Sequence, residues 1–260
     1  MTRVINVAKR RLQEGTLSLG IGVRGVRGVE IARIKKTAGY DWLFIDLEHG
    51  ATSTETAYQI SVAALDAGIA PLVRVPHGEL AMGTRLLDGG ALGVVIPHVD
   101  TAEVARAMVN AFKFAPLGRR SIGGGYPQFG FAATPAKEVV SELNDATLVI
   151  AMIETPEAVA NAAAIAAVPG IDVLLMGTND LCLEMGIPGQ LDDERVVAAM
   201  DAVIHACKQH GKWPGLGGVY GKELMKRYIG RGMRFILAGN GLSVLLAAAQ
   251  DQAQFARDCL

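Results

Sequence analysis

Short apolar runs alternate with helical segments along the whole chain, and this alternation restricts the fold more than any other feature. A strand, a helix and a second strand in succession favour parallel pairing, because parallel strands need a long crossover between them. The predicted strands are residues 17–23, 42–47, 71–75, 93–99, 147–153, 172–176, 213–219 and 235–238. Eight such units in 260 residues predict an α/β fold, with a single (β/α)₈ TIM barrel domain over residues 1–260. A doubly wound open sheet is the alternative.

Two terminal helices and one long loop lie outside this repeat. Residues 4–13 have the pattern of a basic amphipathic helix, which we expect to cap the barrel floor rather than to bind a membrane surface. The last helix, residues 242–259, is apolar on several sides, which fits ordinary packing on its own barrel. Residues 115–131 are rich in glycine and have a length typical of functional lids or disordered segments.

Composition excludes several classes of protein. A formal net charge of −1 argues against nucleic acid as the main partner, and an apolar fraction of 50% is enough for a large core. Cys182, Cys207 and Cys259 show no CxxC spacing, so neither disulfides nor a zinc site is expected. Charges interrupt the N-terminal segment where a signal peptide needs its apolar core, and no apolar run is long enough to cross a bilayer. We therefore expect a soluble, cytoplasmic protein without a membrane partner.

Two carboxylates follow neighbouring predicted strands, Glu154 after residues 147–153 and Asp180 shortly after residues 172–176. Because ligands bind at the carboxyl ends of parallel strands, both side chains should converge on one spot. Two carboxylates repel each other unless one stays protonated or a hard divalent cation lies between them. Such a site accepts Mg²⁺, Mn²⁺ or Co²⁺ and leaves coordination positions for water and substrate. The alternative is that each carboxylate caps the helix that follows it.

A histidine and an arginine are placed at the same predicted face. His49 follows the second strand and can act as a base near neutral pH; a hydrogen-bonded structural role is the alternative. Arg74 lies in an apolar strand, where a guanidinium needs an anion. It either forms a salt bridge to a local acid such as Asp46 or faces a substrate oxygen that becomes negative. Rim or core roles are expected for His77 and His98.

Six motifs, in this order and spacing, resemble the HpcH/HpaI aldolase family: FIDLEHG, LVRVP, LLDGGALGVVIPHV, APLGRRSIGGG, IAMIET and LLMGTNDL. The resemblance covers residues 17–240 and implies a barrel of the phosphoenolpyruvate/pyruvate superfamily. It implies a class II aldolase that uses a divalent metal ion (Mg²⁺, Mn²⁺ or Co²⁺). Such an enzyme reversibly cleaves a 4-hydroxy-2-oxo acid to pyruvate, or a related 2-oxo acid, and an aldehyde. It also implies a homo-oligomer, a hexamer built as a trimer of dimers, in which the last helix, residues 242–259, packs across a subunit boundary.

The resemblance assigns roles residue by residue. Glu154 and Asp180 match metal ligands, His49 matches the base, and Arg74 matches the group that stabilises the enolate or ketone oxygen. Asp88 matches the acid that raises the basicity of the histidine. The segment Gly177, Thr178, Asn179 and Asp180 falls where the family binds the 2-oxo acid carboxylate. Arg120 matches a recurrent Gly-x-Arg position.

The chain departs from the family pattern at two positions, and a third is hard to place. Met152 stands where the family often has glutamine, and Thr178 stands where proline is common. Asp88 follows a helix, so a simple barrel places it near the end opposite His49. We expect it to reach the site of a neighbouring subunit.

Other functions remain open from the sequence. A related lyase could act on an acyl-CoA ester or decarboxylate oxaloacetate, although Lys113, Arg119 and Arg120 offer only a weak phosphate-binding groove. A Schiff-base aldolase needs a lysine in a strand, and the lysines here fall on helices or loops. A catalytically silent barrel that binds a 2-oxo acid is the third alternative.

Overall fold

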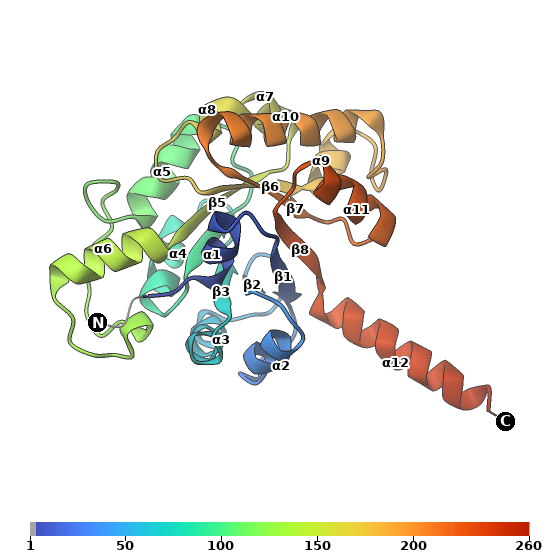
Figure 1. The fold of residues 1–260 in the computed structure, drawn as a ribbon, viewed down its shortest axis with the longest axis horizontal. Coiled ribbons are helices and arrows are strands. Elements are labelled where there is room, and N and C mark those ends of the chain that lie inside the picture. The colour runs from blue at the N-terminus through green and yellow to red at the C-terminus, as the bar shows by residue number, and fades with distance from the viewer. Residues whose placement is uncertain (1–3, 260) are drawn as a thin grey trace.

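The computed structural model describes residues 4–259 and shows a closed barrel of eight parallel strands (Figure 1). The strands are β1 (Ser18–Val23), β2 (Trp42–Asp46), β3 (Ala70–Arg74), β4 (Gly93–Ile96), β5 (Leu148–Ile153), β6 (Val173–Gly177), β7 (Trp213–Gly217) and β8 (Phe235–Asn240). β1 pairs with β8 as well as with β2, so the sheet has no free edge and the open-sheet alternative is excluded. The predicted barrel is confirmed.

Helices surround the barrel, in most cases at the predicted places. They are α1 (Val7–Gln13), α2 (Ile31–Thr37), α3 (Thr54–Ala67), α4 (Leu80–Asp88), α5 (Ala102–Phe112), α6 (Ala136–Ala146), α7 (Pro156–Ala160), α8 (Ala162–Ala166), α9 (Thr178–Glu184), α10 (Glu194–His210), α11 (Lys222–Arg231) and α12 (Gly241–Arg257). The alanine-rich crossover between β5 and β6 is two short helices that meet at Asn161. The helix α9 starts directly after β6, so Asp180 lies in its first turn.

Large rings fill the lower part of the barrel. Trp42 of β2 stacks on Phe235 of β8, with ring centroids 4.1 Å apart. A side chain at Gly20 of β1 would place its Cβ 2.2 Å from the Trp42 ring, so only glycine fits there. Both rings are fully buried. The indole fits because Gly20 on the neighbouring strand has no side chain and leaves the space free.

The helix α1 closes the barrel floor, as predicted. Ala8 and Leu12 on its inner face are buried among the side chains that fill the barrel interior. Asn6 caps the helix through its Oδ1, which accepts from the Lys9 N–H at 3.2 Å. Its Nδ2 donates to the carbonyl oxygens of Leu92 and Ala146, so one side chain ties the helix to two segments that lead into strands.

The glycine-rich loop, residues 115–131, contains the short 3₁₀ helix η1 (Pro127–Phe129) and lies against the C-terminal end of α4. Gln128 Nε2 donates to the carbonyl oxygens of Leu87 and Ala91 there. Because the loop follows a helix rather than a strand, it lies at the end of the barrel away from the carboxyl ends of the strands. It is therefore not a lid over the site of its own subunit.

The last helix, α12, leaves the barrel and projects away from it (Figure 1). None of its residues is buried, and Val244, Leu245, Leu246 and Phe255 are between 49% and 65% exposed. In the single chain, α12 therefore does not pack along its own barrel, which was the alternative considered from the sequence. Within residues 4–259, none of the helices has the length and apolar character needed to cross a membrane.

Candidate active site

A cavity of about 320 Å³ opens at the carboxyl ends of the strands. Every second residue of a strand points into the barrel. The inward residues deeper in the barrel are apolar and form the base of the cavity, whereas those at the strand ends are polar and form its wall. The base is formed by Phe44, Met152, Leu175 and Leu237. The predicted site residues that line the cavity are His49, Arg74, Glu154, Gly177, Thr178, Asn179 and Asp180.

Arg74 and Asp46 form a buried ion pair at one side of the cavity. They end neighbouring strands and occupy the same register, so their side chains point into the barrel side by side. Arg74 Nε and Nη2 donate to the two Asp46 carboxylate oxygens at 3.0 and 2.7 Å. Arg74 Nη1 also lies 2.9 Å from Glu48 Oε2. The salt bridge to Asp46 weighed from the sequence is present, and Arg74 also lines the cavity.

Charge pairing opposes the effect of burial on both partners. Burial alone raises the pKa of Asp46, but hydrogen bonds and charge from Arg74, with a further bond from Arg24, bring it below its usual value. Burial alone lowers the pKa of Arg74, but Asp46 and Glu48 hold it above its usual value. Both groups stay ionised, so Arg74 is a fixed positive charge at the cavity wall.

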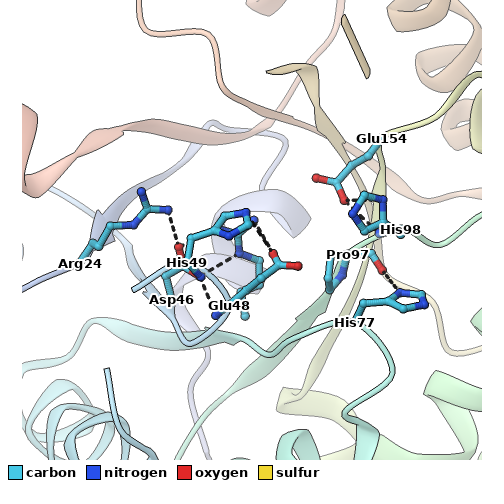
Figure 2. Close-up of polar contacts among 9 residues, drawn as sticks. Arg24, Asp46, Glu48, His49, His77, Pro97, His98 and Glu154 are labelled. Atoms are coloured by element: carbon cyan, nitrogen blue, oxygen red, sulfur yellow. Dashed lines mark hydrogen bonds and ion pairs between the residues drawn. The ribbon is translucent and has the colours of Figure 1, made fainter. Parts of the chain in front are cut away.

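His49 lies in a short turn held by Asp46. The Asp46 Oδ1 atom accepts from the backbone N–H groups of Glu48 and His49 at 3.1 and 3.2 Å (Figure 2). Gly50 follows with φ of +148°, a conformation that L-residues with side chains avoid. The imidazole is 56% exposed, and its Nε2 lies 3.7 Å from Glu48 Oε2. The turn therefore presents a ring with access to both the cavity and solvent.

Glu154 is the most deeply buried carboxylate at the cavity, with a side-chain exposure of 1%. The backbone N–H of His98 donates to its Oε2 at 2.9 Å, while His98 itself adopts a left-handed φ of 51°. A Cβ at Gly177 would lie 2.3 Å from Glu154 Oε1, so the carboxylate occupies the space that a side chain on β6 would take. Burial raises the pKa of Glu154 to about 7, and the charge of Asp180 adds to the rise.

These two carboxylates fit a divalent cation. Glu154 and Asp180 line the same cavity, and repulsion between their charges adds to the larger effect of burial in raising the pKa of Glu154. A cation removes that conflict, and oxygen donors suit Mg²⁺ or Mn²⁺. Within residues 4–259 there is no cluster of three or more His, Cys, Asp or Glu side chains suited to a metal ion. With Glu154 and Asp180 as its protein ligands, a cation would keep its remaining positions for water and substrate.

The turn after β6 is fixed from the neighbouring strand. The Thr178 hydroxyl donates to the Gly217 carbonyl oxygen of β7 at 2.7 Å. Gly218 has φ of +88°, and a Cβ there would lie 2.3 Å from Thr178 Oγ1. Thr178 is buried and Asn179 is exposed to the cavity mouth, so the turn presents the start of α9 to a bound ligand.

Three other candidates lie outside the cavity lining. His77 Nδ1 lies 3.3 Å from the Pro97 carbonyl oxygen, and its ring meets that of His98 at 5.8 Å, which fits the rim roles expected for both (Figure 2). Asp88 ends α4, where its Oδ1 accepts from Arg120 Nη2 at 2.7 Å. The Arg120 side chain is 1% exposed and stacks over Phe114. Within one chain, Asp88 and His49 are not brought together.

Sequence reasoning missed the cavity residues that follow β1, β7 and β8. These are Arg24, Tyr220, Asn240 and Ser243. Each lies within three residues of a strand or at its end, so the strand-end rule applied to Glu154 would have found them. Burial raises the pKa of Tyr220, against the opposing charges of Arg24 and Arg74.

The chain is similar to known proteins over most of its length. The family model described as HpcH/HpaI aldolase/citrate lyase matches residues 27–246. The chain is 41% identical over 254 residues to 4-hydroxy-4-methyl-2-oxoglutarate aldolase tasA of Hapsidospora irregularis, covering 95% of this chain and 93% of that protein. It is also 41% identical over 244 residues to 4-hydroxy-4-methyl-2-oxoglutarate aldolase cghB of Chaetomium globosum, covering 92% and 90%.

A solved structure shows the same fold over the same length. The HpcH/HpaI aldolase from Desulfitobacterium hafniense superposes with a TM-score of 0.92 at 30% identity, covering 97% of each chain. The family model, the relatives and this structure extend over nearly the whole barrel, including the strands that carry Arg74, Glu154 and Asp180. The resemblance indicated by the motifs is confirmed, and the chain belongs to the HpcH/HpaI aldolase/citrate lyase family.

Proposed function

We propose that the protein is a divalent-metal-dependent aldolase that reversibly cleaves a 4-hydroxy-2-oxo acid to pyruvate, or a related 2-oxo acid, and a carbonyl compound. The observation that carries the proposal is the convergence of Glu154, Asp180, Arg74 and His49 on one cavity. The names of the relatives from Hapsidospora irregularis and Chaetomium globosum support the substrate class, because 4-hydroxy-4-methyl-2-oxoglutarate is a 4-hydroxy-2-oxo acid. Its cleavage between C3 and C4 gives pyruvate.

Glu154 and Asp180 would hold the cation, which supplies Lewis acidity at the 2-oxo acid when bound. Arg74 presents a guanidinium held by Asp46 and Glu48, so its positive charge is preorganised to stabilise negative charge that develops on the C2 oxygen. His49 has an accessible imidazole at the same cavity, where it can take the C4 hydroxyl proton during cleavage and return it during synthesis. Thr178 and Asn179 offer the start of α9 to the substrate carboxylate.

The proposal is tested by removing and restoring the metal. The protein is treated with EDTA, dialysed and assayed for pyruvate release from a racemic 4-hydroxy-2-oxo acid, with and without Mg²⁺, Mn²⁺ or Co²⁺. We expect release to disappear with the chelator and to return with at least one of these ions. Release that is unaffected by exhaustive metal removal would contradict the proposal.

The other lyase activities find less support in the residues. Of the three residues that the sequence offered for the phosphates of coenzyme A, Arg119 is exposed, whereas Lys113 and Arg120 are buried. Lys113 Nζ donates to the Asn144 carbonyl oxygen at 2.9 Å, and Arg120 pairs with Asp88. The part of the cavity wall that the structure describes contains no lysine, so a Schiff base has no donor there. No specific contact favours oxaloacetate decarboxylation or a silent binding role over the aldolase.

The protein is also proposed to form a homo-oligomer in which α12 packs on a neighbouring subunit. An exposed row of leucine and valine side chains on a helix that leaves its own barrel is costly in water. The start of α12 contributes Ser243 to the cavity, so the helix would join the site to the subunit interface. Assembly would also bring Asp88 to the site of a neighbouring subunit, close to the His49 of that subunit, as expected from the sequence.

Replacing both Leu245 and Leu246 by glutamate tests this assembly. Each leucine is about 60% exposed in the single chain, 64% and 59% respectively, so charge there would cost little in a monomer but much in an interface. We expect the wild type to be an oligomer by size-exclusion chromatography with light scattering, and the double variant to dissociate. Gln252→Glu, on the same helix, is the control. A monomeric wild type would contradict the assembly.

A further inference from the structure

Arg24 is a second arginine at the cavity, and the proposed reaction assigns no role to it. It follows β1 directly and lines the cavity with a side chain that is 37% exposed. On the basis of the proposed aldolase function, we propose that Arg24 binds a carboxylate at the distal end of the substrate. The substrate class would then be dicarboxylic 4-hydroxy-2-oxo acids, in which the carbon beyond C4 carries an acid group.

The first argument is that Arg24 has more unused N–H donors than Arg74. Arg74 uses Nε and Nη2 on Asp46 and Nη1 on Glu48, and its side chain is only 7% exposed. Within the described residues, the only hydrogen bond of Arg24 joins Nη2 to Asp46 Oδ2 at 2.8 Å (Figure 2). Its Nε is buried without a hydrogen-bond partner among them. A guanidinium with unused donors at a cavity wall is suited to a carboxylate, which accepts two parallel hydrogen bonds.

The second argument is the position of Arg24 relative to the proposed metal ligands. In the closed barrel, β1 lies opposite β5, with three strands between them on either side. Arg24 after β1 and Glu154 after β5 therefore face each other across the cavity mouth, and Figure 2 shows His49 between them. A substrate with its 2-oxo acid end at Glu154 and Asp180 would present C4 near His49. Its distal end would point to Arg24.

The third argument is that the backbone fixes where Arg24 stands. Gly25 follows it with φ of +72°, so the chain turns sharply at the end of β1. A Cβ at Gly25 would lie 3.1 Å from Leu242 Cδ1 of α12, which leaves little room for that turn to move. The bond to Asp46 then holds the guanidinium at the cavity wall. Arg24 is thus anchored at both its backbone and its head group.

The test compares two substrates that differ only at the distal end. 4-Hydroxy-2-oxoglutarate has a carboxylate there, and 4-hydroxy-2-oxovalerate has a methyl group in its place. The measured quantity is the ratio of kcat/KM for the first to kcat/KM for the second, for wild type, Arg24→Met, Arg24→Lys and Arg27→Met. Arg27 is a nearby arginine that is exposed and lies outside the cavity lining. Because both substrates are measured with the same variant, a general loss of activity caused by disturbing Asp46 cancels in the ratio.

We expect the wild type to favour the dicarboxylate and Arg24→Met to lower the ratio by about 10- to 100-fold, the loss of a charge-assisted bond to a carboxylate. Arg24→Lys should retain part of the preference, and Arg27→Met should retain all of it. An unchanged ratio in both Arg24 variants would overturn the assignment. Proton exchange of pyruvate is measured on the same wild-type preparation. If exchange occurs and the ratio does not change, only the Arg24 assignment fails, whereas absent exchange and absent cleavage overturn the aldolase as well.

Discussion

Replacing Glu154 by glutamine is expected to lower the rate of metal-dependent pyruvate release by about 10³-fold, because the site loses the deeper of its two proposed metal ligands. The amide has nearly the same shape and can occupy the space beside Gly177, so the fold should be preserved. The side chain would carry no charge to offset a divalent cation. Activity is measured over a range of Mn²⁺ concentrations, and metal affinity is measured by isothermal titration calorimetry.

The control for this variant is Glu157→Gln, which changes an exposed carboxylate three residues along the chain. It should leave both metal affinity and activity unchanged. If Glu154→Gln binds Mn²⁺ as tightly as the wild type, Glu154 is not a metal ligand and its burial needs another explanation.

The same carboxylate sets a pH dependence of metal binding. Burial first, and the charge of Asp180 in addition, raise the pKa of Glu154 from 4.5 to about 7 in the metal-free protein. A proton and the cation then compete for Glu154, so apparent affinity should fall about tenfold per pH unit below pH 7. The raised pKa also means that the metal-free fold holds this proton more tightly than the unfolded chain. Stability of the metal-free protein should therefore decrease as pH rises from about 4.5 to 7, and Glu154→Gln should lack this decrease.

Replacing Arg74 by methionine is expected to have the second large effect, on both rate and stability. Removing it leaves Asp46 and Glu48 without their shared cation, and a broken buried pair costs about 3–5 kcal/mol in the free energy of unfolding. The C2 oxygen would also lose a preorganised positive charge, which lowers kcat by about 10²- to 10³-fold. Thermal unfolding gives the first quantity, and steady-state kinetics at saturating metal give the second.

Arg74→Lys separates the two effects. Lysine keeps a positive charge near Asp46 but cannot make the two parallel bonds that Arg74 makes, so it should recover part of the stability and little of kcat. Arg85→Lys, at an exposed position on α4, is the control. A fully active Arg74→Lys enzyme would show that any positive charge suffices and that the bidentate geometry has no catalytic role.

Much of this site could be predicted because it follows one rule of parallel barrels. Glu154, Asp180, His49 and Arg74 all come at or just after the end of an apolar strand, and the closed barrel brings those ends together. The hydrophobic pattern alone locates such strand ends to within a few residues. The ion pair of Arg74 with Asp46 was also within reach, because both residues end neighbouring parallel strands.

Other features depend on contacts that a pattern does not contain. The hydrogen bond of Arg24 to Asp46, and the position of Ser243 of α12 at the cavity, join residues that are far apart in the sequence. The length of the glycine-rich loop is typical of lids or disordered segments, but the loop follows α5 and packs at the other end of the barrel. Asp88 binds Arg120 there, and its proposed contact with His49 requires a second subunit, which one chain cannot show.

The most direct test of the central claim is exchange of the pyruvate C3 protons with deuterium, followed by ¹H NMR in D₂O. The experiment needs no knowledge of the carbonyl product and reports formation of the enolate alone. We expect the methyl signal to disappear with wild-type protein and Mn²⁺ or Mg²⁺, and to persist with EDTA or with Glu154→Gln. A folded, metal-supplemented wild type that leaves the methyl signal intact would contradict the assignment of this cavity to enolate chemistry of pyruvate.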